Sequence, residues 1–248
     1  MITITGLGDH DAGLRDQDRR IRRSRSAGLG DQDGPDYALA KPVFQRLFQE
    51  YGLPRIIRTD NGVPFATVTL GRLSRLSVWW IRLGIFPELI EPASPQQNGS
   101  HERMHRTLKA ETTRPARGNL RAQQRRFNTF RKEFNEVRPH EALGQETPAS
   151  IYRSSPRQLP PKLPPVEYPA HFEVRLVSRN CGIRWKGNRV CVTHTLEREY
   201  VGLEEVDDGI WDVYFGPVRL GRMDERTLRI EDYRGRLTRK RVSPMSPD

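Results

Sequence analysis

The chain has few cysteines and no long apolar run. Its two cysteines among 248 residues, Cys181 and Cys191, lie outside any CxxC pattern, so neither a disulfide framework nor a zinc site is predicted. The longest notable apolar stretch, Val78 to Ile81, is far shorter than the about 20 residues of a membrane span. The start, Met1 to Thr5, has neither the basic nor the apolar region of a signal peptide. We therefore expect a cytoplasmic protein with reduced thiols and no membrane partner.

The chain also has fewer acidic than basic residues. Against 31 Asp and Glu the chain has 42 Lys and Arg, a net charge of +11, and most of the excess is arginine, whose planar fork suits phosphate. Residues 37–153 carry most of it, with 19 basic and ten acidic side chains. From Arg114 to Lys132 there are seven basic residues and no acid. A solvated helix face is the ordinary interpretation of such a run, but the missing acids favour a nucleic-acid partner.

Residues 1–36 contain no aromatic residue and little periodic apolar pattern. They repeat Gly-Leu-x-Asp-x-Asp at Gly6, Gly13 and Gly28, which is typical of disordered, low-complexity sequence. An Asp-x-Asp pair can bind a metal ion. Here no strand or helix fixes the pairs, so low complexity is the preferred interpretation.

The pattern changes at Asp36, where regular secondary structure is predicted to begin. Apolar residues at helical spacing predict a helix up to Tyr51, stopped by Gly52. A strand over 55–59, a helix from Leu73 to Leu83, a strand over 85–90, a loop over 92–99 and helices over 99–113 and 120–137 follow. Trp79 and Trp80 are expected in the core rather than as a base-stacking platform.

Six prolines between Pro156 and Pro169 predict a semi-rigid spacer between domains. Beyond them, short β-rich runs over 173–177, 183–185, 189–192, 200–203 and 210–215, separated by turn signals, predict a small antiparallel barrel. Trp185 and Trp211 are expected in its core. The predicted organisation is a disordered segment 1–36, a core 37–153, a spacer 154–170, a barrel 171–232 and a basic tail 233–248.

Two acids stand at positions suited to chemistry. Asp60 follows a strand, and Glu102 lies in the first turn of a helix, so the pair can converge on a hard divalent cation beside a phosphodiester. Arg106 and Lys109 follow Glu102 by four and seven residues, which places them on the same helix face. The alternatives are an ordinary Asp-Asn-Gly turn for Asp60 and a favourable helix-dipole contact for Glu102.

Four phrases give the segment around these acids a specific signature: Phe44 to Pro54, Arg58 to Gly62, Pro95 to Arg103 and Phe134 to Leu143. In these phrases the sequence resembles the bacterial insertion-sequence transposases whose catalytic core is shared with retroviral integrases. The resemblance runs from about Tyr37 to Tyr152 and more faintly through the C-terminal barrel.

The resemblance implies an α/β fold, a ribonuclease H-like integrase core, followed by the Pro-rich linker and an SH3-like DNA-binding barrel. It implies an Asp-Asp-Glu triad with two Mg²⁺ or Mn²⁺ ions, in which Asp60 matches the second acid and Glu102 the third. The expected activity is metal-dependent phosphodiester cleavage and strand transfer on element-end and target DNA. A homo-multimer in the bacterial nucleoid is expected, because two DNA ends are joined together.

Eight residues are expected to contact DNA. They are Asn98, Arg103, Arg106, Lys109, Arg114, Arg117, Arg121 and Arg125. His101 and His105 are expected to face solvent or DNA, and His140 to order the turn after its helix.

The first acid of the triad has no match. The aspartates ahead of the predicted core lie outside any apolar alternation, namely Asp9, Asp11, Asp16, Asp18, Asp31, Asp33 and Asp36. We therefore expect a truncated or frame-disrupted transposase whose remaining strands expose apolar faces and edges. A catalytically inactive DNA-binding remnant or transposition inhibitor is the alternative, and a structural domain without nucleic acid is a third.

Overall fold

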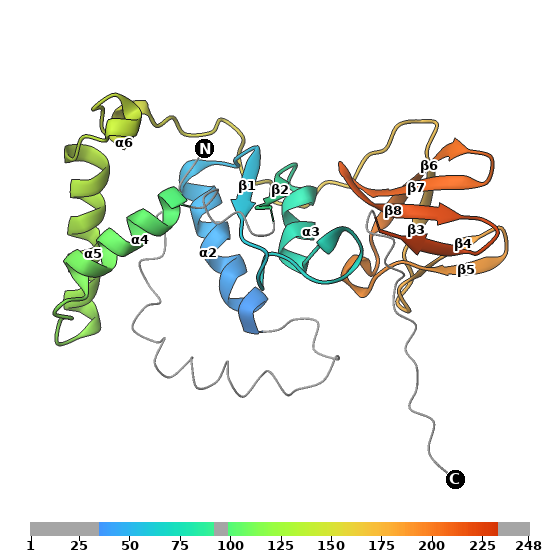
Figure 1. Cartoon of the computed structure of the whole chain (residues 1–248), viewed down its shortest axis with the longest axis horizontal. Helices are drawn as coiled ribbons and strands as arrows, with labels where there is room; N and C mark the ends of the chain where they lie inside the picture. The colour runs from blue at the N-terminus through green and yellow to red at the C-terminus, as the bar shows by residue number, and fades with distance from the viewer. Residues whose placement is uncertain (1–34, 92–98, 233–248) are drawn as a thin grey trace, which may run out of the picture. The chain divides into compact units, whose positions relative to one another are not determined.

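The computed structural model describes residues 35–91 and 99–232 (Figure 1). The expectations for residues 1–34, for most of the loop over 92–99 and for the tail 233–248 lie outside the described residues. Within the described part, one compact unit comprises residues 38–59 and 88–159, and a second comprises 35–37, 60–87 and 160–232. We call them unit 1 and unit 2. None of the described helices is both long and apolar enough to cross a membrane.

Unit 1 is built around helix α2 (Pro35–Tyr51) and strand β1 (Ile56–Thr59). Leu47 and Phe48 of α2 are buried, and the helix ends where the Gly52 N–H donates to the Phe48 carbonyl at 3.0 Å. Gly52 has φ +77°, and a Cβ there would lie 2.3 Å from the Ser155 carbonyl oxygen. Both the backbone conformation and the close approach therefore require glycine.

Strands β1 and β2 (Phe86–Leu89) form a two-stranded sheet. The Ile90 N–H donates to the Thr59 carbonyl at 3.0 Å, and Arg58 pairs with Glu88 at 2.7 Å. Ile56 is 54% exposed. This exposure confirms the expectation that a sheet of so few strands leaves apolar side chains uncovered.

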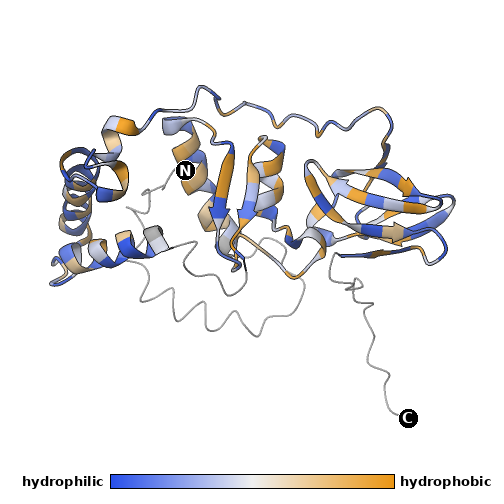
Figure 2. Ribbon diagram, turned by 45° about the horizontal axis from the view of Figure 1, so that its top comes forward, coloured by the Kyte–Doolittle hydropathy of each residue, from blue (hydrophilic) through white to orange (hydrophobic). Residues whose placement is uncertain are grey.

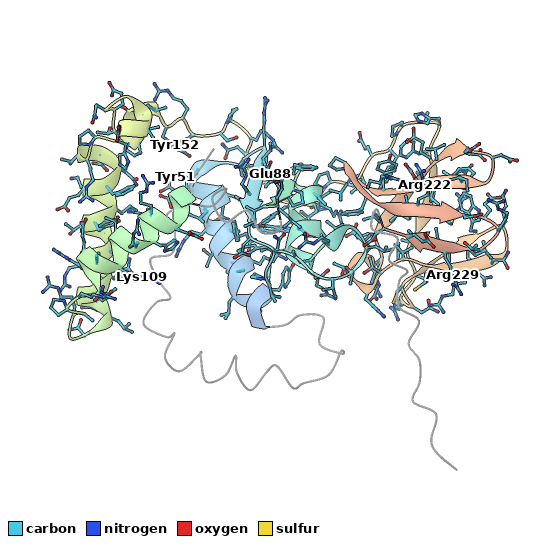
Figure 3. The ribbon with its side chains drawn as sticks, in the orientation of Figure 1. Tyr51, Glu88, Lys109, Tyr152, Arg222 and Arg229 are labelled. Atoms are coloured by element: carbon cyan, nitrogen blue, oxygen red, sulfur yellow. The ribbon has the colours of Figure 1, made fainter. Side chains whose placement is uncertain are left out.

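The remaining elements of unit 1 are helical. They are α4 (Gly99–Thr112), α5 (Leu120–Lys132), the π-helical turn η3 (Glu133–Val137), the 3₁₀ turn η4 (Glu141–Leu143) and α6 (Pro148–Ile151). The single helix predicted over 120–137 thus changes its hydrogen-bonding pattern at Glu133. Tyr152, after α6, packs edge to face on Tyr51 with ring centroids 6.0 Å apart (Figure 3).

Unit 2 contains η1 (Leu70–Arg72), helix α3 (Arg75–Arg82) and the C-terminal strands. A reciprocal capping box between Ser74 and Ser77 starts α3. Strands β3 (Glu173–Leu176), β6 (Tyr200–Asp207), β7 (Ile210–Phe215), β8 (Val218–Asp224) and β9 (Arg229–Glu231) form one antiparallel sheet in the order β3-β6-β7-β8-β9, and β4 (Gly182–Trp185) and β5 (Asn188–Cys191) form a hairpin. The 3₁₀ turn η5 (His194–Leu196) follows the hairpin.

One hydrophobic core unites these elements of unit 2. Leu70, Leu73, Val78 and Ile81 belong to the same buried cluster as the apolar side chains of the C-terminal strands. Figure 2 shows hydrophobic and hydrophilic residues alternating along those strands. All four tryptophans, expected in cores, are buried, which confirms that expectation. Residues 60–87 therefore fold against the C-terminal sheet, although they precede it by a long stretch of chain.

Each end of the Pro-rich segment is bonded to the unit it belongs to. In unit 1 the Leu53 N–H donates to the Arg157 carbonyl at 2.7 Å. In unit 2 Arg82 donates to the Leu163 and Pro164 carbonyls at 3.2 and 3.0 Å and pairs with Glu199 at 3.1 Å. The mixed helices and sheets fit the α/β class. The semi-rigid spacer, the SH3-like barrel and the domain limits remain predictions.

Candidate nucleic-acid interface and carboxylates

Asp60 lies directly after β1, as predicted, in an exposed turn. Its Oδ1 accepts the Gly62 N–H at 3.0 Å, and the Phe65 N–H donates to the Gly62 carbonyl at 2.9 Å. One carboxylate oxygen therefore organises the turn. The turn fixes the position of the carboxylate, and Asp60 is exposed.

Glu102 lies in the first turn of α4, as the sequence predicted. It is exposed and lines a shallow surface pocket with His105, Arg106, Lys109 and Arg114. Figure 3 shows Lys109 on this helix. Glu102 is thus surrounded by cations, an arrangement suited to a phosphate group brought beside a carboxylate.

The two carboxylates belong to different compact units, Asp60 to unit 2 and Glu102 to unit 1. Among the residues that the structure describes, no three His, Cys, Asp or Glu side chains are grouped so that they could hold a metal ion. Hard divalent cations in proteins take several oxygen ligands. The described donors therefore do not fit a two-metal site.

The predicted DNA-contacting cations are exposed and lie on α4, α5 and the turn between them; Figure 1 shows these two helices. We call this set of cations the α4–α5 surface. Its members are Arg103, Arg106, Lys109, Arg114, Arg117, Arg121 and Arg125, whose side chains form no ion pair within the described part of the chain. From Gly99 to Lys132 there are ten basic and two acidic residues. Asn98 lies outside the described residues.

Side-chain hydrogen bonds join α4 to α5, and none of the cations of the α4–α5 surface takes part in them. The Gln123 side-chain amide donates to the Thr112 carbonyl at 3.1 Å, and Arg126 donates to the Glu111 carbonyl at 3.0 and 3.3 Å. The Glu111 carboxylate also accepts hydrogen bonds from both Nη atoms of Arg138, at 2.9 and 3.0 Å. These hydrogen bonds from Arg138 hold the pKa of the Glu111 carboxyl below its usual value. The charge of Glu111, one of the two acids of this segment, is therefore balanced by Arg138.

The turn after α5 is ordered by an aromatic cluster. Phe130 and Phe134 stack at 5.4 Å, the His140 ring meets Phe134 edge to face at 4.6 Å, and the Arg138 guanidinium lies over both phenylalanines. His140 Nε2 is 3.2 Å from the Phe134 carbonyl oxygen. The predicted ordering role of His140 is confirmed. The sequence prediction missed Glu111 and Arg138, since 27 positions separate them and no local pattern links them.

Two protein-family models match separate segments of the chain. A family model described as "Integrase core domain" matches residues 83–148, and one described as "IS481 family transposase, C-terminal domain" matches residues 172–231. Over these two segments the chain is similar to insertion-sequence transposases with an integrase core. The first match contains Glu102 and the whole α4–α5 surface, and the second contains all strands of unit 2 after the Pro-rich segment.

Curated relatives match shorter stretches of the chain. The chain is 34% identical over 102 residues to the "Insertion element IS476 uncharacterized 39.2 kDa protein" of Xanthomonas euvesicatoria, covering 40% of this chain and 28% of that protein. It is 35% identical over 78 residues, 32% of this chain, to the "Gag-Pol polyprotein" of baboon endogenous virus (strain M7) and the "Pol polyprotein" of feline endogenous virus ECE1. It spans 4% and 7% of those two proteins.

Proposed function

We propose that this transposase-family chain acts in DNA transposition and integration by binding DNA along the α4–α5 surface. The observation that carries the proposal is the set of seven exposed cations without ion pairs among the described residues, on the segment that matches the integrase core. Cations that neutralise phosphates release counterions from DNA, a gain that grows with each contact. The helices hold the arginines in a fixed arrangement, so less side-chain freedom is lost when they meet a phosphate strand.

The reaction proposed for the family core is phosphodiester cleavage and strand transfer with a divalent metal. A bound metal would supply Lewis-acid activation and charge neutralisation at the phosphate. Asp60 and Glu102 are the proposed carboxylates, and Arg106 and Lys109 would orient the phosphate beside Glu102. Because the described donors do not fit such a site, cleavage requires a ligand set completed by residues beyond the described part.

DNA binding without cleavage is a second candidate function, favoured by the same two-carboxylate observation. Such a chain would occupy element ends or target DNA and would interfere with an intact transposase. Both candidates include DNA as the partner, a homo-multimer on DNA and a place at the nucleoid. They differ in whether a phosphodiester bond is broken.

Binding is tested by fluorescence anisotropy with the full chain and a labelled duplex. Arg121→Ala with Arg125→Ala removes two proposed phosphate contacts, and at a slope of about 0.9 per contact the affinity at 0.15 M salt should fall by about 30-fold. The matched control, Lys162→Ala with Arg226→Ala, removes the same charge from exposed sites in unit 2, where Arg226 already pairs with Asp224. Equal losses in the two variants would reject the α4–α5 surface as the binding site.

Cleavage is tested on supercoiled plasmid and on duplexes taken from both flanks of the gene, in Mg²⁺ and in Mn²⁺. Nicks or strand-transfer products that disappear in Asp60→Asn and in Glu102→Gln would establish the catalytic candidate. Binding without any such product would establish the second candidate. Asn at position 60 retains the oxygen that accepts the Gly62 N–H, so loss of activity in that variant reports on charge rather than on the turn.

A further inference from the structure

Strand β3 forms one edge of the five-stranded sheet of unit 2, where it pairs with β6 alone. Val177, which follows β3, donates its N–H to the Glu199 carbonyl, just ahead of β6, at 2.9 Å. Because successive residues of an antiparallel strand alternate in the direction of their hydrogen bonds, the N–H and C=O groups of Val174 and Leu176 are directed away from β6. Within the described part of the chain, no second strand pairs with this edge. The backbone of β3 therefore offers hydrogen-bonding groups to another strand.

The same edge exposes apolar side chains. Val174 and Leu176 are 40% and 48% exposed, and Tyr200, opposite Leu176 on β6, is 52% exposed. Proteins often protect an edge strand with lysine or proline, and β3 contains neither. At the other end of the sheet, Ile230, the apolar residue of β9, is only 1% exposed. Apolar exposure thus distinguishes the β3 edge from the β9 edge.

The sequence of the β3 edge is complementary to itself. From Phe172 to Leu176 the chain alternates apolar, acidic, apolar, basic and apolar residues. When two copies pair antiparallel about Val174, Glu173 of each copy faces Arg175 of the other, and Phe172 faces Leu176. Opposite charges and apolar side chains placed directly across from each other both stabilise a pair of strands. The two Val174 residues then exchange N–H to C=O hydrogen bonds across the two-fold axis.

The two charged side chains are already held at this edge. Arg175 Nη1 donates to the Val174 carbonyl at 2.9 Å, Arg175 Nη2 pairs with Glu173 at 2.7 Å, and the guanidinium lies over the Trp185 ring at 5.3 Å. The Glu173 and Arg175 side chains are still 49% and 37% exposed. Carbonyl and carboxylate oxygens accept more than one hydrogen bond, and a guanidinium has five N–H donors. Both side chains can therefore contact a second copy with little further loss of side-chain freedom.

We propose that the β3 edge is a self-association surface, on which β3 of a second copy of this chain pairs antiparallel about Val174. A two-fold axis forms both ion pairs from the same two residues, as an isologous interface requires. A strand of unrelated sequence would match the backbone of the edge but not its alternation of charge. The proposal deepens the proposed function, since it gives the homo-multimer named there a specific contact, but this contact requires no DNA.

The test is sedimentation velocity on the full chain without DNA, at protein concentrations from about 1 to about 100 μM, the range of weak protein–protein contacts. The wild-type chain should show a reversible monomer–dimer equilibrium. Glu173→Arg places arginine opposite arginine twice in the dimer, so the dimer Kd should rise by at least about 10-fold. Glu231→Arg makes the same change at an exposed position on β9 and should leave the Kd unchanged. A monomeric wild-type chain, or equal Kd values for Glu173→Arg and the wild type, would overturn the proposal.

A charge exchange separates contact between copies from a role within one chain. Arg175→Glu alone should also weaken the dimer, whereas an equimolar mixture of Glu173→Arg and Arg175→Glu should restore it, because opposite charges face each other again. The pair between Glu173 and Arg175 within one chain is lost in both variants, so only contact between copies can produce the recovery. Tryptophan fluorescence confirms that each variant is folded. Folded variants whose mixture stays monomeric would contradict the proposal, and the comparison of Glu173→Arg with Glu231→Arg decides it even if Arg175→Glu fails to fold.

Self-association and DNA binding fail in different ways. If the chain binds duplex DNA through the α4–α5 surface but is monomeric without DNA, only the β3 proposal is wrong. If it dimerises with the expected sensitivity to Glu173→Arg but does not bind duplex DNA, the proposed function is wrong and the β3 edge stands.

Discussion

The shared core of unit 2 makes a specific prediction about Ile81. This residue of α3 is 5% exposed and belongs to the same buried cluster as the C-terminal strands. Its Cγ2 packs against Gly216, at the end of β7, so closely that a Cβ there would lie 2.7 Å away. Truncation by Ile81→Ala therefore leaves a cavity between α3 and the sheet, not at the surface.

The magnitude follows from the burial of the side chain. Removal of a fully buried Ile side chain to Ala costs about 2 to 5 kcal/mol. A loss of about 3 kcal/mol, divided by a urea m-value of about 2 kcal/mol per molar, lowers the unfolding midpoint by about 1.5 M. Val68→Ala is the matched control: Val68 is 98% exposed in the same unit, so the free energy of unfolding of this variant should stay within about 0.5 kcal/mol of the wild type.

Tryptophan fluorescence provides the assay, because all four tryptophans, Trp79, Trp80, Trp185 and Trp211, lie in unit 2. Urea unfolding followed by this signal reports on unit 2 alone. Leu203→Ala, in the buried centre of β6, is the positive control. If Leu203→Ala lowers the midpoint and Ile81→Ala does not, α3 and the C-terminal sheet do not share a core and the reasoning is wrong.

Three further predictions concern ionisable groups. Burial raises the pKa of Tyr168 to about 12, so its contribution to stability is complete below about pH 10 and is lost as the pH rises toward about 12, as absorbance titration and alkaline unfolding should show. Burial alone would raise the pKa of Asp212, but hydrogen bonds from Arg222 (Figure 3) and Arg219 hold it below its usual value. Asp212→Asn should therefore cost about 1 to 2 kcal/mol at pH 7 and almost nothing once the pH falls well below about 4, in urea titrations at each pH. Glu111→Gln should lower the stability of unit 1 by at most about 1 kcal/mol, because the pair with Arg138 is more than a third exposed; far-UV circular dichroism follows the loss, and a larger loss would mean that the pair does more than join α4 to α5.

The sequence predicted the helices well because their apolar residues recur at a clear helical period. The stripe from Leu73 to Leu83 became α3, which ends ahead of Gly84 at φ +69°. Strands β8 and β9 were missed. Gly221 interrupts β8, yet glycine is required there, because a Cβ would lie 2.3 Å from the Glu231 carbonyl oxygen of the neighbouring strand. A glycine that permits close strand approach looks like a strand breaker in the sequence alone.

The grouping of residues 60–87 with the C-terminal strands was also beyond the sequence. It depends on contacts such as Gly71 against Leu220, where a Cβ on the glycine would lie 2.7 Å from the leucine Cδ2. Such long-range packing leaves no periodic signal. The functional residues show the same difference between local and long-range information. Sequence phrases identified Asp60 and Glu102, whereas only the strand pairing shows that Val174 and Leu176 lie at an edge of the sheet.

The central claim is that the described chain binds DNA through phosphate contacts made by many fixed cations. The most direct measurement is the affinity of the wild-type full chain for a short duplex between about 50 and 200 mM salt. The account predicts a straight log–log plot with a slope of about −6 or steeper, of which the seven cations of the α4–α5 surface supply about 6. A slope near zero, or no binding at the lowest salt concentration, would contradict it.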